Sequence, residues 1–274
     1  MTSWYSGHVQ TNGIRTHYYR TGGDKPVLIL LHGATDDGLC WTRLAHALEA
    51  NYDIIMPDAR GHGLSDAPLE DYSTSSRAAD VASLIQALRL DRPAVAGHSM
   101  GAVTALQLAA DYPSMLRCGI LEDPVFRLSA DPLPVAEREA RASRALQLMN
   151  ERKALGRDGL IAHCREQNPT WSEEEYGPWA DAKLRVSPNF AGRRAVDNWP
   201  WRELLTNVRC PILLITGDID RGAIVSPEAA TEAQQIQPLV SVVHLSGAGH
   251  NIRREQFDPY VQAVRSFLAS SYSF

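Results

Sequence analysis

One serine stands between two glycines in GHSMG (residues 97–101), where the apolar run of residues 93–98 gives way to a helical pattern of small and apolar residues. A tight strand-to-helix turn strains the backbone, and glycines at its flanks avoid collisions with the neighbouring strand and helix. Such a turn pushes the hydroxyl of Ser99 outward. The unpaired N–H groups of the following helix can stabilise negative charge beside it, which is the chemistry of acyl transfer.

A serine hydroxyl is a weak nucleophile at neutral pH and needs a base, which in turn needs a carboxylate to fix its tautomer. His250 is the best candidate base among the nine histidines of the chain. It follows the last expected strand in LSGAGHN, where two glycines allow a close turn. The sequence therefore pairs Ser99 with His250.

The elements that would position these residues follow from hydrophobic patterning. Apolar runs typical of buried parallel strands occupy residues 26–33, 52–58, 93–99, 116–124, 210–218 and 240–247. Amphipathic segments typical of helices occupy residues 39–50, 73–90, 100–113, 226–238 and 254–270. This alternation predicts a mostly parallel, doubly wound α/β sheet, in which functional groups gather beyond the carboxyl ends of the strands.

The first residues predict an antiparallel edge to this sheet. Two short strands at residues 8–11 and 14–20 flank Asn12-Gly13, a dipeptide that readily adopts the positive φ angles of a tight hairpin turn.

The alternation stops between residues 125 and 200. No convincing strand occurs there, residues 135–155 alternate charged and apolar residues at helical spacing, and a segment rich in Trp, Pro and Glu follows. We therefore predict a core of residues 1–124 and 201–274 with a helical cap, or lid, inserted at residues 125–200. A length of 274 residues is compatible with one core and one insertion.

Five short motifs stand at the ends of the expected strands: LLHGATDD, DARGHGLSD, GHSMG, TGDID and GAGH, in that order. Together they resemble the α/β-hydrolase fold superfamily, with GHSMG as the nucleophile elbow, and the resemblance spans nearly the whole chain. It implies an α/β-hydrolase fold with an inserted lid and a catalytic triad that contains Ser99 and His250.

The resemblance also implies Asp220 as the triad acid, because similar families place it after the seventh strand, in the chain order Ser99, Asp220, His250. The segment departs from the usual pattern, since RGA follows Asp220 before the next apolar residues. Asp218 in the same motif is a competitor.

Some relatives instead carry the acid after the sixth strand, where LEDP supplies Glu122 and Asp123. Successive strand residues face opposite sides, so only one of the two can point to the pocket. Asp123 could alternatively make a turn hydrogen bond where the inserted segment begins. We predict Asp220 as the acid and keep this pair as the alternative.

An oxyanion hole needs two converging backbone N–H donors, each worth on the order of 3 kcal/mol of barrier. Met100, directly after the serine, supplies one. The resemblance implies Ala34 N–H as the other, with Gly33 allowing close approach of that loop. His32 and His62 resemble family positions where the ring braces loops near the site. His98 lies inside the elbow, and we expect its side chain to point away from the reaction. We assign all three structural roles.

Four of the six tryptophans lie in the insertion or directly after it, at positions 171, 179, 199 and 201. We expect most of them to pack the helical layer and at least one to line the pocket. A mostly apolar, aromatic cleft favours an uncharged, apolar acyl substrate such as an ester, lactone or thioester. The cations of this segment are interpreted as a solvated helix surface: Arg141, Arg144, Arg152, Lys153 and Arg157.

Composition narrows the class of protein. The formal net charge of −5 offers no cationic field for nucleic acid. No signal-peptide pattern and no run of about 18 apolar residues occurs, so no membrane association is expected and the cytoplasm is the default location. The four cysteines are far apart, and no metal or nucleotide-binding motif is present, so no cofactor and no metal are expected.

The leading hypothesis is a carboxylesterase-like serine hydrolase, in which Ser99 forms an acyl-enzyme, His250 transfers protons, Asp220 orients His250, and Ala34 and Met100 hold the oxyanion. A cofactor-free haloperoxidase or lyase could use the same triad, and a ligand receptor of the same fold could keep it with little turnover. The sequence leaves the natural substrate and the oligomeric state open.

Overall fold

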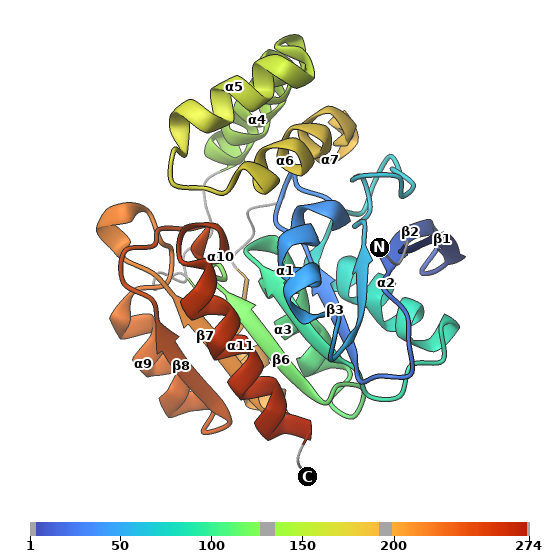
Figure 1. The fold of residues 1–274 in the computed structure, drawn as a ribbon, viewed down its shortest axis with the longest axis vertical. Helices are drawn as coiled ribbons and strands as arrows, with labels where there is room; N and C mark the ends of the chain where they lie inside the picture. Colours follow the sequence, from blue (N-terminus) through green and yellow to red (C-terminus); the bar gives the residue numbers. More distant parts are fainter. Residues whose placement is uncertain (1–3, 127–134, 192–198, 273–274) are drawn as a thin grey trace.

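The computed structural model describes residues 4–126, 135–191 and 199–272 and contains one eight-stranded sheet (Figure 1). The strands are β1 (Tyr5–Gln10), β2 (Arg15–Arg20), β3 (Val27–Leu31), β4 (Asp53–Pro57), β5 (Ala94–His98), β6 (Cys118–Glu122), β7 (Ile212–Thr216) and β8 (Val240–His244). Their order across the sheet is β1-β2-β4-β3-β5-β6-β7-β8.

The predicted hairpin forms the edge of this sheet. Strands β1 and β2 pair antiparallel around Gly13, which has φ +76°, and β2 pairs antiparallel with β4. From β4 to β8 every neighbouring pair is parallel. The predicted α/β architecture with a mostly parallel sheet is therefore confirmed, and β5, which ends at the serine motif, lies near its centre.

Helices cover both faces of the sheet. The helices of the core are α1 (Thr42–Leu48), α2 (Thr74–Ala87), α3 (Met100–Asp111), α8 (Trp201–Asn207), α9 (Pro227–Ile236), α10 (Ile252–Glu255) and α11 (Phe257–Tyr272), with short 3-10 turns η1 (Gly38–Trp41) and η2 (Ile219–Arg221). One apolar cluster joins α2, α3, α8 and α9 to one face. A second joins α1, α10 and α11 to the other. Burial on both faces explains why the central strands lack polar alternation.

The closing helix differs from the single helix expected at residues 254–270. It is divided into α10 and α11, with Gln256 outside helical geometry at φ −130° and ψ 60°. Pro259 has no N–H to donate to the carbonyl of Glu255, so a continuous hydrogen-bond ladder could not pass this point.

In the described part of residues 125–200 the regular elements are helices, as expected. They are α4 (Val135–Ala154), α5 (Gly156–Gln167), α6 (Glu173–Arg185) and α7 (Pro188–Ala191). These four, which we call the cap helices, lie together on one side of the sheet-containing body (Figure 1). The division into core and cap domains at 1–124, 125–200 and 201–274 stays a prediction.

Among the described residues, none of the helices has both the length and the apolar character that a membrane span requires.

Candidate active site

Ser99 occupies the sharp turn between β5 and α3, with φ +51° and ψ −109°. A Cβ on Gly97 would lie 2.3 Å from the backbone of Gly101, and a Cβ on Gly101 would lie 2.0 Å from the carbonyl oxygen of Leu31. Both glycines are therefore required by close backbone packing, as predicted. The elbow holds Ser99 in a conformation that few non-glycine residues adopt.

A cavity of about 870 Å³ opens at this turn. Ser99 lines it together with Ala34 and Met100, the two residues expected to supply the oxyanion donors. Met100 is the first residue of α3, where an N–H has no acceptor within the helix. The structure therefore gathers the predicted nucleophile and both donor residues around one cavity, while their catalytic roles stay predictions.

His250 lies beside this elbow, and its carboxylate partner is Asp123. The ring nitrogen Nδ1 of His250 is 2.5 Å from Oδ2 of Asp123, whose side chain is fully buried. The backbone N–H groups of Ile224 and Val225 also donate to the Asp123 carboxylate, at 2.9–3.0 Å. A carboxylate only accepts, so Nδ1 is the donor and Nε2 is left as the nitrogen that can take a proton.

The predicted partnership of Asp220 with His250 is therefore wrong. Asp220 is exposed in η2, the 3-10 turn that follows β7. After Gly222 takes the left-handed conformation at φ +99°, the chain turns Ile224 toward Asp123. The loop after β7 thus supplies backbone donors to the acid instead of the acid itself. The segment RGA at residues 221–223, which departs from the usual family pattern, lies in the part of the loop that takes this different path.

Asp123 itself has φ +44° at the end of β6, a backbone position that side chains seldom adopt. Its neighbour Glu122 points the other way and binds Arg253, accepting from its backbone N–H at 3.0 Å and its guanidinium at 3.3 Å. Only one of the two acidic residues reaches His250, as the alternation of side chains along a strand requires.

Asp218, the other competitor, braces the loop that leads to His250. It accepts from Gly247 N–H at 2.6 Å and lies 2.9 Å from the ring of His244.

His98 couples the elbow to the His250 loop. The two rings are 4.7 Å apart, and Nε2 of His98 lies 2.9 Å from the carbonyl oxygen of His250. Burial lowers the pKa of His98 well below its usual range, so the ring is neutral and donates one hydrogen bond to this carbonyl. No hydrogen bond joins Ser99 to His250 in the described residues; such bonds often tighten only when substrate binds.

His32 and His62 support the loops around the cavity, as expected. His32 accepts from Ala59 N–H at 3.0 Å, and His62 accepts from Thr35 N–H at 3.3 Å. Nδ1 of His62 lies 2.9 Å from the carbonyl oxygen of Arg60, which fixes Nε2 as its acceptor nitrogen. Burial lowers the pKa of His62 well below its usual range, which keeps this acceptor available.

A buried group of charges fixes cap helix α6 to the core. The Asp36 cluster contains three acids and three bases: Asp36, Glu122, Glu175, Lys183, Arg253 and Arg254. Asp36 lies 2.5 Å from Lys183 and 3.1 Å from Arg254, and the side chains of all three are at most 5% exposed.

The Asp36 cluster reaches the loop that carries Ala34. Lys183 also donates to the carbonyl oxygen of Thr35 at 2.9 Å, and Thr35 has φ +64°. Burial alone would raise the pKa of Asp36, but the cations Lys183, Arg254 and Arg253 hold it well below its usual range. A residue of the cap therefore binds the carbonyl of Thr35, the residue that follows the expected oxyanion donor Ala34.

Three of the four tryptophans pack instead of lining the cavity. The ring centroid of Trp171 lies 4.6 Å from the guanidinium of Arg254, and that of Trp179 lies 4.8 Å from the ammonium of Lys183. Trp201 stacks on Phe126 in the core. Trp199 lines the cavity. The expectation that most tryptophans pack and at least one lines the pocket is confirmed.

The cavity is more charged than the sequence predicted. Among the described residues, its wall includes five cations and one acid: Arg77, Arg141, Arg144, Arg152, Lys183 and Glu137. The sequence predicts a solvated surface for Arg141, Arg144 and Arg152, but one stripe of α4 places them on the cavity wall. Helical periodicity identified the stripe, whereas the orientation of α4 came from tertiary packing.

No group of His, Cys, Asp and Glu within the described ranges could hold a metal ion. The four cysteines are buried thiols, as expected.

Comparisons with known proteins identify the family and the fold of this chain. A family model described as "Alpha/beta hydrolase family" matches residues 28–263. N-formylmaleamate deformylase from Pseudomonas putida is 33% identical over 270 residues, which cover 96% of each chain. 2-(Acetamidomethylene)succinate hydrolase from Mesorhizobium japonicum is 27% identical over 257 residues, covering 91% of this chain and 90% of the relative.

A crystal structure of N-formylmaleamic acid deformylase from Pseudomonas putida S16 superposes with a TM-score of 0.75 at 26% identity. It covers 95% of this chain and 100% of that one. These relatives are hydrolases, and the match extends over the whole sheet as well as the elbow. The chain belongs to the alpha/beta hydrolase family.

Proposed function

We propose that this protein is a serine hydrolase that transfers an acyl group from its substrate to Ser99 and then to water. The observation that carries the proposal is the contact of His250 with the buried Asp123 beside a strained serine elbow at a large cavity. The family membership and the hydrolase names of the relatives support it.

In the proposed mechanism, Nε2 of His250 takes the proton of the Ser99 hydroxyl as Oγ attacks the acyl carbon. The Asp123 carboxylate accepts from Nδ1 and stabilises the imidazolium that forms. The N–H groups of Ala34 and Met100 receive the oxyanion. His250 then protonates the leaving group, and the same residues direct water against the acyl-enzyme.

The bond that is cleaved has two candidates. The resemblance of the motifs favours an ester, lactone or thioester. The relatives named N-formylmaleamate deformylase and 2-(acetamidomethylene)succinate hydrolase favour an N-acyl bond as the second candidate, because both names describe an acyl group on nitrogen. Rates on matched ester and amide substrates with the same acyl group would distinguish the two.

The first test is the dependence of turnover on Ser99. Purified protein should hydrolyse short-chain 4-nitrophenyl esters and react with a fluorophosphonate probe, and Ser99→Ala should lose at least about 10⁴-fold in kcat and all labelling. Equal turnover by the two proteins would refute the proposal. Labelling without turnover of any acyl substrate would favour the ligand-receptor alternative.

The second test concerns the acid. Asp123→Asn should lower kcat by about 10⁴-fold, because the amide can donate to Nδ1 and so stabilise the wrong tautomer of His250. Asp220→Asn is the matched control and should stay within about twofold of the wild type. The reverse ranking of the two variants would return Asp220 to the role that the sequence suggested.

A further inference from the structure

The described cations of the cavity come from three helices, and that of α6, Lys183, is already paired with Asp36. Helix α4 contributes Arg141, Arg144 and Arg152, and α2 contributes Arg77. Arg141 is paired with Glu137 at 2.6 Å. No hydrogen bond or ion pair to Arg144 occurs among the described residues, and its side chain is exposed. Arg152 lies 5.9 Å from the ring centroid of Trp179.

Helical spacing orients the α4 cations. Positions 141, 144, 148 and 152 follow one face of the helix at intervals of three or four residues, and all four line the cavity. Leu148 and Met149 supply the apolar surface between the guanidinium groups. This face therefore offers cationic groups over an apolar strip, which suits a short carbon chain that ends in an anion.

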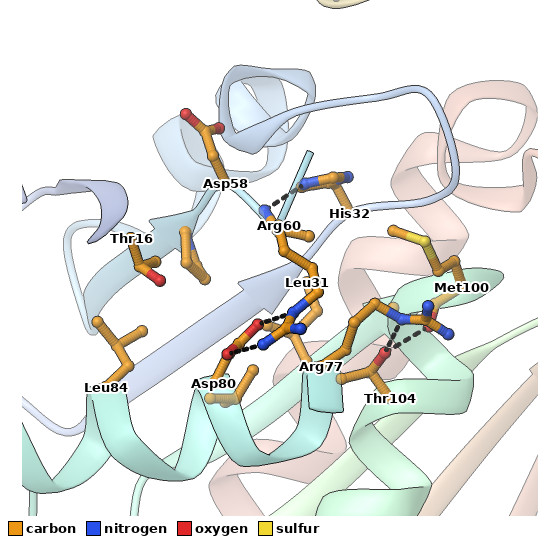
Figure 2. Close-up of a pocket in the computed structure, with 14 residues that line it drawn as sticks. Thr16, Leu31, His32, Asp58, Arg60, Arg77, Asp80, Leu84, Met100 and Thr104 are labelled. Carbon is orange, nitrogen blue, oxygen red and sulfur yellow. Dashed lines mark hydrogen bonds and ion pairs between the residues drawn. The ribbon is translucent and has the colours of Figure 1, made fainter. Parts of the chain in front are cut away.

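Arg77 is held on the opposite wall by oxygen atoms. Its guanidinium donates to the carbonyl of Tyr72, to Thr74 Oγ1 at 3.1 Å and to Thr104 Oγ1 at 3.3 Å. Thr104 in turn donates to the carbonyl of Met100 at 2.9 Å. Figure 2 shows Arg77 reaching across from α2 to Thr104 and Met100, at the start of α3. Arg77 is thus fixed near the elbow that carries Ser99.

The first turn of α2 adds to this positive field. Ser73, Thr74 and Ser75, at the N-terminus of this 14-residue helix, line the same cavity as Arg77. The first N–H groups of a helix have no acceptor within it, and the helix dipole favours an anion there. The Ser73 hydroxyl already donates to the Asp71 carboxylate at 2.8 Å, so the further donors are the hydroxyls of Thr74 and Ser75.

The sign of the charge is unusual for this chain. The protein carries a formal net charge of −5, yet the described residues of its cavity wall include five cations and one acid. Of these cations, Lys183 is paired with Asp36 and Arg141 with Glu137. Low-dielectric walls lined by one sign of charge concentrate ligands of the opposite sign. Arginine presents a planar fork that matches a carboxylate with two parallel hydrogen bonds.

We infer that the cavity binds the carboxylate of an anionic acyl substrate, in which a second, ionised carboxyl group lies several bonds from the scissile acyl carbon. Arg77, the first turn of α2 and Arg144 form this carboxylate subsite, and Arg152 extends it along α4. This inference deepens the proposed function and rests on it, and it replaces the apolar, uncharged substrate that the sequence suggested.

A matched pair of esters tests the subsite. Mono(4-nitrophenyl) adipate carries a free carboxylate, and methyl 4-nitrophenyl adipate has that group neutralised at nearly the same size. For the wild type, kcat/KM for the anionic ester should exceed that for the neutral ester by at least about tenfold, mainly through KM. The ratio should fall as NaCl is raised, because salt screens the attraction.

Arg144→Gln and Arg77→Gln should each reduce this ratio about five- to tenfold. The matched control is Arg157→Gln, a cap arginine that pairs with Asp181 away from the cavity lining and should leave the ratio unchanged. Arg144 is exposed, so Arg144→Gln is expected to fold. This variant tests the carboxylate subsite even if Arg77→Gln fails to fold.

Failure of the inference differs from failure of the proposed function. Turnover that depends on Ser99 but shows no preference for the anionic ester would overturn the carboxylate subsite alone. If neither ester is hydrolysed, a binding measurement tests the inference. Calorimetry on Ser99→Ala should show at least tenfold tighter binding of monomethyl adipate than of dimethyl adipate. The double variant Ser99→Ala/Arg144→Gln should lose this preference. Equal binding of the two compounds would overturn the inference.

Discussion

Helices α6 and α4 of the cap both direct cations toward the core, but into different surroundings. Lys183 of α6 is buried against the Asp36 carboxylate and the Thr35 carbonyl. Arg144 of α4 is an exposed side chain on the wall of the cavity. Removing one partner from a buried, paired charge leaves the other stranded, whereas an exposed charge is already solvated.

Cations of the cap helices therefore serve two purposes: those of the Asp36 cluster stabilise the contact with the core, and those of α4 face the cavity. The Asp36 cluster joins the cap to the loop of the expected oxyanion donor, and its acids and bases balance. Among the described residues of the cavity wall, the α4 cations outnumber the acid, so their charge is available to a ligand. Substitutions in α6 should therefore change stability, and substitutions in α4 should change substrate preference.

The largest expected effect is that of Asp36→Ala. It would leave Lys183, Arg253 and Arg254 with one buried carboxylate fewer, so the free energy of unfolding should fall by about 3–5 kcal/mol. Urea denaturation would measure the change. A loss below about 1 kcal/mol would show that the Asp36 cluster does not hold the cap to the core.

Lys183→Met should have a smaller effect, since Asp36 keeps Arg254 as a partner. We expect a loss of about 1–3 kcal/mol in stability, because the carbonyl of Thr35 loses a donor. A fall of about tenfold in kcat with little change in KM should accompany it if Thr35 positions the Ala34 donor. Lys153→Met, which removes a comparable bond to the carbonyl of Val186, is the control and should keep kcat.

The pH dependence of stability should report the neutral His62 next to this loop. Burial lowers its pKa in the folded protein, so below the unfolded pKa of about 6.5 the unfolded chain binds a proton that the folded chain does not. Stability should then fall as pH drops from 7 to 5, with a slope approaching about 1.4 kcal/mol per pH unit from this one residue.

Denaturation at several pH values would measure that slope for the wild type and for His62→Gln. His62→Gln should reduce the slope. Identical slopes in the two proteins would contradict a buried, neutral His62.

Arg144→Ala should have the smallest effect on stability, within about 0.5 kcal/mol of the wild type, because its side chain is exposed. The same urea denaturation measures it beside Asp36→Ala. A loss comparable to that of Asp36→Ala would remove the distinction between the two helices.

The order of strands and helices was predictable because each element carries its own period of apolar residues. The elbow was predictable as well, because a serine between two glycines stands where an apolar strand pattern changes to a helical one. The contact that excludes a side chain at Gly101 is nevertheless tertiary, with Leu31 of the neighbouring strand β3. His250 could be selected because two glycines and a strand end precede it.

The acid could not be chosen from the sequence. Asp123 and Asp220 both follow buried strands, and both fit the chain order of known triads. The choice depends on how the loop after β7 folds, and there Ile224 and Val225 donate their N–H groups to Asp123. The segment RGA after Asp220 departs from the usual family pattern, but this departure does not predict the path of the loop.

The sequence by itself determined the sheet, the serine turn and the histidine, because these depend on local conformation and on hydrophobic periodicity. Tertiary structure alone decided which carboxylate meets His250, which charges are buried in the Asp36 cluster and which arginines face the cavity. Those outcomes depend on contacts between residues separated by about a hundred positions, such as Asp123 and His250, and short-range pattern carries no record of such contacts.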